Sequence, residues 1–267
     1  GIYYNFNDDV VIEDVTFSFD TNDAATFTSE NNNTVTLNNV TFSGRIEQIA
    51  MGEYRDKGNY VEFTNIMNNV VAKDMVVDHP GISCVETIDY MAPLFFLRGE
   101  TTLNNCTITG TTTTANAKKD WNGNYHEVIA YDCGVPNKCN ATFNNCTIDK
   151  LFAWSHSQIT INGSAMKYIR CATHNYSDAK AHLTIGNGSI IDEIVVTSSG
   201  QQKFVIIDGK KTLIAEPWAP ALIIKAGATV KRLDMNGRPR VNKNGVETLI
   251  IEEGAIVNEI INLAENN

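Results

Sequence analysis

Two carboxylates and an imidazole lie close together in the sequence, at Asp74, Asp78 and His79. The alternation of apolar and polar residues around them predicts a strand, and residues four apart on a strand face the same side. Carboxylates bind calcium, and a carboxylate or an imidazole moves protons in acid–base catalysis. The three residues are therefore candidates for a catalytic site. The alternative is a solvated strand face that ends at a turn beginning with His79.

A second group of candidates consists of aromatic and histidine side chains in an irregular part of the chain. Residues 111–138 depart furthest from the regular pattern and contain Trp121, Tyr125 and His126. Binding groups concentrate on loops held by a rigid scaffold, and an indole ring offers flat apolar area to a sugar. Trp154 and His156 follow and extend this predicted ligand-binding surface. The alternative is that these rings pack onto the scaffold or fill its core.

The elements that would position these residues are indicated by a repeated motif. Leu37–Phe42 reads LNNVTF, Leu103–Ile108 reads LNNCTI, and Phe143–Ile148 reads FNNCTI. An apolar residue is followed by two asparagines and then by an apolar–Thr–apolar alternation, which predicts a strand after the asparagine pair. Asparagine tolerates the left-handed backbone region better than most residues, so the pair suits a sharp bend.

The second half of the chain repeats a glycine in place of the asparagine pair. Gly163, Gly188, Gly227 and Gly254 each follow a short apolar strand and precede another. Alignment of the residues after these glycines places Asp192 between Lys167 and Lys231, and Arg232 between Glu193 and Glu259. Opposite charges on adjacent strands stabilise a sheet by about 0.2–1 kcal/mol per pair.

Repeats of about twenty to fifty residues with turn residues at fixed offsets are typical of a solenoid, whose units share a core by stacking. The sequence therefore predicts an all-β fold, a right-handed parallel β-helix in one domain spanning 1–267. Coils with asparagine corners occupy 1–150, with a loop insertion at 111–138, and coils with glycine corners occupy 151–267. The competing architecture is an antiparallel β-sandwich.

The cysteines and the net charge narrow the possible functions. None of the six cysteines forms a CxxC pair, so no zinc site is predicted. Cys106 and Cys146 occupy the same motif position and are expected to be free, stacked and buried, whereas Cys133 and Cys139 are either free or closed into a disulfide loop. A net charge of −10 without a basic cluster argues against nucleic acid as a partner. No apolar run is long enough for membrane insertion.

The asparagine motifs resemble those of the right-handed parallel β-helix superfamily, the pectate-lyase-like fold, and the resemblance covers most of the chain. The chain also resembles uncharacterised secreted β-helix proteins of gut bacteria. Pectate-lyase-like chemistry uses aspartates that hold calcium and an arginine base, often near a WIDH-like strand. Met75–His79, which reads MVVDH, echoes that strand without its tryptophan, and the polygalacturonase-like motifs do not occur as a set.

These observations lead to an expected function. We expect a secreted or cell-surface module, adhesin-like, that presents a long flat face and one loop to a carbohydrate or a host surface, without a cofactor. One alternative is a polysaccharide lyase or glycoside hydrolase with a divergent site at Asp74, Asp78 and His79, for which calcium is the expected cofactor if it is a lyase. Another is a structural stalk of a larger secreted protein. The sequence indicates no oligomeric state.

Overall fold

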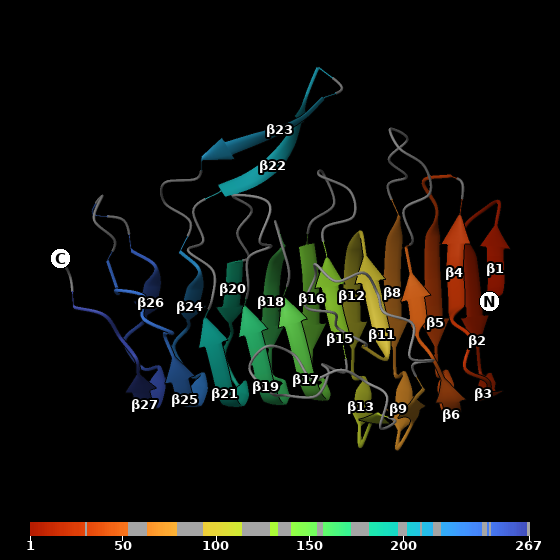
Figure 1. The fold of residues 1–267 in the computed structure, drawn as a ribbon, viewed down its shortest axis with the longest axis horizontal. Helices are drawn as coiled ribbons and strands as arrows, with labels where there is room; N and C mark the ends of the chain where they lie inside the picture. The colour runs from red at the N-terminus through yellow and green to blue at the C-terminus, as the bar shows by residue number, and fades with distance from the viewer. Residues whose placement is uncertain are drawn as a thin grey trace.

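The fold is all-β and is built from two large sheets that run the length of the molecule (Figure 1). It is known from a computed structural model. The structure describes residues 1–29, 31–52, 63–78, 93–113, 129–132, 140–153, 157–171, 182–196, 202–208, 210–215, 220–241, 245 and 247–265. Strands from successive repeats lie side by side along the long axis, from the N-terminal end at the right of Figure 1 to the C-terminal end at the left.

The first sheet has nine strands, one from each repeat, and is called here the nine-strand sheet. Its strands, in spatial order, are β2 (Val10–Glu13), β5 (Thr34–Asn38), β8 (Thr64–Asn68), β12 (Glu100–Asn104), β16 (Asn140–Asn144), β18 (Gln158–Asn162), β20 (His182–Ile185), β24 (Leu222–Ile224) and β26 (Leu249–Ile251).

The second sheet has sixteen strands and is called here the long sheet. Its strands are β1 (Ile2–Phe6), β3 (Thr16–Asp20), β4 (Ala25–Ser29), β6 (Thr41–Ile46), β7 (Ile49–Met51), β9 (Val71–Lys73), β10 (Val76–Val77), β11 (Phe95–Arg98), β13 (Thr107–Thr109), β14 (Thr112–Thr113), β15 (Ile129–Asp132), β17 (Thr147–Ala153), β19 (Ala165–Cys171), β21 (Ile190–Val196), β25 (Thr229–Asp234) and β27 (Ile256–Ile261). An antiparallel hairpin, β22 (Gln202–Ile207) and β23 (Lys210–Ala215), projects at the top of Figure 1.

Every strand pairing described within the two large sheets is parallel. Leu37, for example, pairs with Met67, and Met67 pairs with Leu103. This pairing confirms the predicted all-β class and parallel stacking of repeats, and it excludes the antiparallel sandwich. A parallel pair requires the chain to cross over between its strands, and here the crossover is the rest of one repeat.

The asparagine corners have the predicted backbone conformation. Asn39, Asn69, Asn105 and Asn145 have φ between 53° and 55°, in the left-handed region. Each of these residues donates its backbone N–H, over 2.9 Å, to the carbonyl oxygen of the asparagine just before the corner of the next repeat; these acceptors are Asn68, Asn104, Asn144 and Asn162. The corner therefore turns the chain and bonds one repeat to the next.

At the first glycine corner there is no room for a side chain. Gly163 occupies the same left-handed corner with φ 57°, and a Cβ at this position would lie 2.5 Å from Oδ1 of Asn145. A side chain at residue 163 would thus displace the asparagine of the preceding repeat, and only glycine fits without movement.

The long sheet changes its form part-way along the molecule. Thr107 of β13 and Ile129 of β15 belong to two separate strands, yet they pair with Thr147 and Leu151 of the single strand β17. β19 and β21 are long, as β17 is. Two of the earlier repeats therefore contribute several short strands to the long sheet, β9, β10 and β11 in one and β13, β14 and β15 in the next, whereas the later repeats contribute one long strand each.

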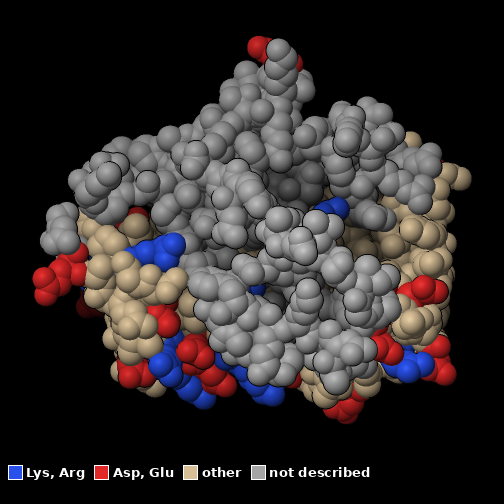
Figure 2. Space-filling model, viewed as in Figure 1, with Lys and Arg blue, Asp and Glu red and all other residues tan. Residues whose placement is uncertain are grey.

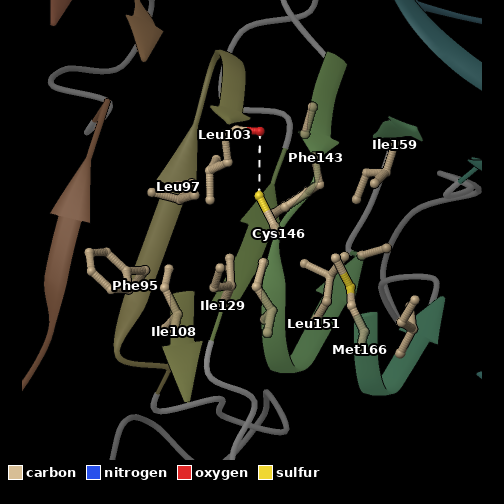
Figure 3. Close-up of a cluster of buried hydrophobic side chains, with 14 of the residues drawn as sticks. Phe95, Leu97, Leu103, Ile108, Ile129, Phe143, Cys146, Leu151, Ile159 and Met166 are labelled. Atoms are coloured by element: carbon tan, nitrogen blue, oxygen red, sulfur yellow. Dashed lines mark hydrogen bonds between the residues drawn. The ribbon is translucent and has the colours of Figure 1, made fainter. Parts of the chain in front are cut away.

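The space between the sheets is filled by one hydrophobic core (Figure 3). Leu103 and Phe143 of the nine-strand sheet point toward Ile108 and Ile129 of the long sheet, and all four are fully or almost fully buried. Core-facing residues of the terminal strands, such as Tyr4 and Val257, are only partly buried. Stacking thus supplies the burial that a single repeat lacks.

The described cysteines form part of this core. Cys106, Cys146 and Cys171 are free and buried, as predicted for the first two. The thiol of Cys146 donates to the carbonyl oxygen of Leu103 over 3.5 Å, and that of Cys106 donates to Met67 over 3.3 Å. Hydrogen bonding with Cys146, together with burial, raises the pKa of the Cys106 thiol, so this thiol stays protonated and unreactive. Cys133 and Cys139 lie outside the described residues.

The predicted register of charged residues is also confirmed. Glu193 pairs with Arg232, and Arg232 pairs with Glu259. Nε of Arg232 lies 3.7 Å from a Glu193 oxygen and 3.8 Å from a Glu259 oxygen. Beside this column, Lys231 contacts Asp192 at 2.7 Å, and Lys167 contacts Asp149 at 2.7 Å.

Replacement of a corner asparagine should separate backbone strain from side-chain bonding. We expect Asn105→Ala to lower the free energy of unfolding by about 1–2 kcal/mol, because alanine is disfavoured in the left-handed region. Asn105→Gly should cost less, since glycine adopts this conformation freely. Urea denaturation of both variants measures the difference. Equal losses in the two variants would show that the left-handed backbone is not the source of the cost.

Charge reversal should test the charged column. Arg232→Glu places a third carboxylate between Glu193 and Glu259 and is expected to destabilise the fold by about 1 kcal/mol, an effect that added salt reduces. The double variant Glu193→Arg/Arg232→Glu restores one pair of opposite charges and leaves the new carboxylate beside Glu259, so it should recover part of the loss. Thermal denaturation at low and high salt measures both effects, and a double variant less stable than the single one would contradict this pairing.

Candidate functional site

The outward side of the nine-strand sheet carries a regular array of small polar side chains. Along each strand, residues alternate between the buried core and the outside, as in the pattern from half-buried Thr34 to half-buried Asn38. The same alternation holds in β8, β12, β16, β18 and β20. The parallel register then places like residues in columns that run across the strands.

Three such columns run across the strands from β5 to β20, the first two over all six strands and the third over the five from β5 to β18, and together they are called here the uncharged face. The first column is Thr34, Thr64, Glu100, Asn140, Gln158 and His182; the second is Thr36, Ile66, Thr102, Thr142, Thr160 and Thr184; the third is Asn38, Asn68, Asn104, Asn144 and Asn162. Asn140 is exposed and the others are half-buried.

Glu100 is the single acidic residue of this face, and the face has no lysine or arginine. The Glu100 carboxylate accepts a hydrogen bond from Nδ2 of Asn140 over 3.2 Å. The protein as a whole has a net charge of −10, and the long sheet carries the ion-paired columns described above. Figure 2 shows acidic and basic side chains mixed along the lower edge of the view, where β19, β21 and β25 begin in Figure 1. The ion-paired columns thus lie on the long sheet, and the uncharged face carries a single carboxylate, that of Glu100.

The third column is a continuous ladder of side-chain amides. Nδ2 of Asn68 donates to Oδ1 of Asn38, and Asn104, Asn144 and Asn162 each donate in the same way to the preceding asparagine, over 2.8–3.1 Å. An amide group has two N–H donors and an oxygen with two lone pairs. Each amide inside the ladder therefore uses one donor and one acceptor and keeps one of each.

The second column is formed mainly by threonines. Thr102, Thr142, Thr160 and Thr184 are consecutive partners, each half-buried between its neighbours. A threonine exposes both a methyl group and a hydroxyl, which donates and accepts hydrogen bonds. The column therefore combines a strip of apolar surface with a row of hydroxyls.

His182 ends the first column. Its Nδ1 lies 2.9 Å from the carbonyl oxygen of Pro220, and because a carbonyl only accepts, Nδ1 is the protonated nitrogen. Nε2 is therefore an acceptor, and this atom is buried without a hydrogen-bond partner. The ring is held in one tautomer at the edge of the uncharged face.

The outward side of the long sheet differs because its central residues are buried. The guanidinium of Arg170 lies 4.1 Å from the centre of the Phe152 ring, and Arg170 and Phe152 are only 2% and 5% exposed. Thr26, on the same side of β4, is also buried. The centre of this sheet therefore presents no open array comparable to the uncharged face.

The predicted catalytic residues lie at a bend in the long sheet. Asp74 has φ 54°, so the chain turns there and forms two short strands, β9 and β10, in place of the one strand expected. Asp78 lies after β10, and its carboxylate is 3.4 Å from a nitrogen of Arg45, which also contacts Asp20 at 3.1 Å. Within the described residues no group of three acidic, histidine or cysteine side chains is arranged to hold a metal ion.

Several of the predicted site residues cannot be placed. His79 and the predicted ligand-binding residues Trp121, Tyr125, His126, Trp154 and His156 lie outside the described residues. The uncharged face was not among the sequence candidates. Its signal was present in the threonine or asparagine at alternate positions of strands such as TVTLN and NATFN, which were interpreted only as strand formers.

Compared with protein-family models, curated proteins and solved structures, the chain matches none of them. No helix in the described part of the chain has the length and hydropathy to cross a membrane.

Interruption of the amide ladder should destabilise the fold locally. Asn104→Ala removes the acceptor of Asn144 and the donor to Asn68, and we expect a loss of about 1–2 kcal/mol in the free energy of unfolding. Asn140→Ala is the matched control, because Asn140 lies on the neighbouring strand, is exposed and makes one hydrogen bond, to Glu100, that is not part of the ladder. Urea denaturation compares them, and equal stabilities would mean that the ladder contributes nothing.

Proposed function

We propose that the chain is a right-handed parallel β-helix that forms one domain over residues 1–267. Support comes from the parallel pairing of successive repeats, the left-handed corners and the shared core. The right hand is the one that connections between parallel strands almost always adopt. The resemblance of the asparagine motifs to those of pectate-lyase-like proteins supports the same proposal.

We further propose that this β-helix is a binding module, adhesin-like and secreted or on the cell surface, whose ligand is a carbohydrate or a host-surface group. The observation that carries the proposal is the near absence of charge from the uncharged face of a protein with net charge −10. Surfaces that face only water normally carry lysine, glutamate and other charged residues. An array of hydroxyls, amides and methyl groups is suited to a ligand that is itself polar and neutral.

The rigidity of the face supports a binding role. Its backbone groups are held within the sheet on both sides of each strand from β5 to β20, and the underlying residues, such as Leu103 and Ile161, are buried in the core. A pre-organised surface loses little conformational entropy when a ligand binds. The proposal includes no cofactor, no nucleic acid and no insertion into a membrane.

A lyase or hydrolase at Asp74, Asp78 and His79 is less well supported. The carboxylate of Asp78 forms an ion pair with Arg45, and Asp74 adopts a left-handed backbone conformation at the bend. Both observations give these residues a role in the scaffold. Calcium-dependent release of reducing ends from a polysaccharide that Asp78→Ala abolishes would favour the enzyme over the binding module.

A bulky charge on the uncharged face should abolish binding. We expect Thr142→Arg and Thr160→Arg each to weaken retention on immobilised neutral polysaccharides or host cells at least about tenfold, a change of about 1.4 kcal/mol. The guanidinium would lie in the middle of the array and displace the ligand. Pull-down of the protein with each polysaccharide, quantified against free protein, measures the change.

Thr147→Arg is the matched control, because Thr147 is an exposed threonine that begins a strand of the long sheet. This variant should bind as the unmodified protein does. Binding lost equally in all three variants would place the effect outside the uncharged face. Absence of binding to every polysaccharide and cell surface by the unmodified protein would favour a structural stalk.

A further inference from the structure

The columns of the uncharged face have a repeat of their own, which restricts the shape of the ligand. Adjacent strands lie about 4.8 Å apart, so the column from Thr36 to Thr184 presents equivalent positions at this spacing over about 24 Å. Neighbouring columns are about 7 Å apart, because outward residues are two apart along a strand. The face is therefore periodic along the stack and only three columns wide.

The remaining hydrogen-bond capacity of the amide ladder selects the chemistry of the ligand. Asn68, Asn104 and Asn144 each keep one donor and one acceptor after the ladder bonds are made. A hydroxyl group uses both, because it donates and accepts at once. A carboxylate only accepts, so half of this capacity would stay unused, and the side-chain acceptors would repel it.

The charge of the molecule points in the same direction. The uncharged face has no lysine or arginine, and its one acidic residue is Glu100. The protein as a whole is negative as well. An anionic polymer would therefore meet repulsion and no compensating ion pair.

From this geometry we propose that the ligand is a linear neutral polysaccharide, and that its chain lies along the columns, parallel to the stack and across the strands. The proposal rests on the binding function proposed above and specifies its ligand. Successive sugar hydroxyls contact successive asparagines and threonines, and the Thr methyl groups with Ile66 lie under the sugar rings. Each added sugar engages another repeat, so affinity grows with chain length until the six strands are covered.

Methyl NMR of the unmodified protein tests the proposal without a variant that could misfold. Protein labelled at threonine and isoleucine methyl groups is titrated with disaccharides and hexasaccharides of neutral glucan, mannan, xylan and galactan, and with oligogalacturonates of the same lengths. For at least one neutral series we expect shifts at Ile66, Thr102, Thr142 and Thr160, and affinity at least about tenfold higher for the hexasaccharide than for the disaccharide. Oligogalacturonates should leave these signals unchanged.

Three results would overturn the proposal. These are shifts confined to other methyl groups such as Thr107 and Thr147, equal affinity for short and long neutral chains, and no shift with any neutral series. If one of these results is obtained but the protein still binds an insoluble polysaccharide in a pull-down, the binding function stands and only this ligand geometry is rejected. If the protein also binds no insoluble polysaccharide, both the binding function and this ligand geometry are rejected.

Discussion

Residue-by-residue stacking of one repeat on the next is the constraint on which the whole structure depends. A single repeat buries too little apolar surface to fold alone, and its strands have backbone groups that must pair with another repeat. The left-handed corner at Asn39, Asn69, Asn105 and Asn145 fixes where each repeat turns, and its N–H bonds directly to the next repeat. Because the corner occupies the same place in each of these repeats, it also aligns the side chains of successive repeats in columns.

Strict stacking also explains why side chains at one position cannot vary independently. The amide of Asn145 fills the space where a Cβ of residue 163 would lie, so glycine takes the corner in the next repeat. Opposite charges alternate from Asp149 to Lys167 and from Asp192 to Lys231 for a similar reason. The side chains of one repeat therefore restrict the residue types that are favourable at the same positions of the next repeat.

The parallel fold could be predicted from the sequence because its determinants are local and repeated. Asparagine pairs before an alternating strand indicate a left-handed bend wherever they occur, and the offset after each glycine gave the register of Glu193, Arg232 and Glu259 correctly. The fusion of two short strands into β17 was not predictable, because it depends on whether a bend persists in a neighbouring repeat. The strand around Asp74 was wrongly expected to be continuous, since its left-handed residue was not recognised as a corner.

The uncharged face was missed because no single residue in it is unusual. Thr142 and Thr160 are ordinary strand residues, and only the register that sets them side by side makes them a surface. Sequence reasoning instead favoured residues with reactive side chains, such as Asp78, which in the structure forms an ion pair with Arg45. Surfaces formed by repetition are visible only after the repeats have been aligned in space.

The amide ladder has a direction as well as a position. From Asn162 back to Asn38, every bond of the ladder is donated toward the N-terminal repeat and accepted from the C-terminal one. The amide dipoles consequently add along the stack instead of cancelling, much as peptide dipoles add along a helix. A polymer whose two ends differ would meet this row in two inequivalent orientations, so the surface distinguishes head from tail although its side chains are the same from one repeat to the next.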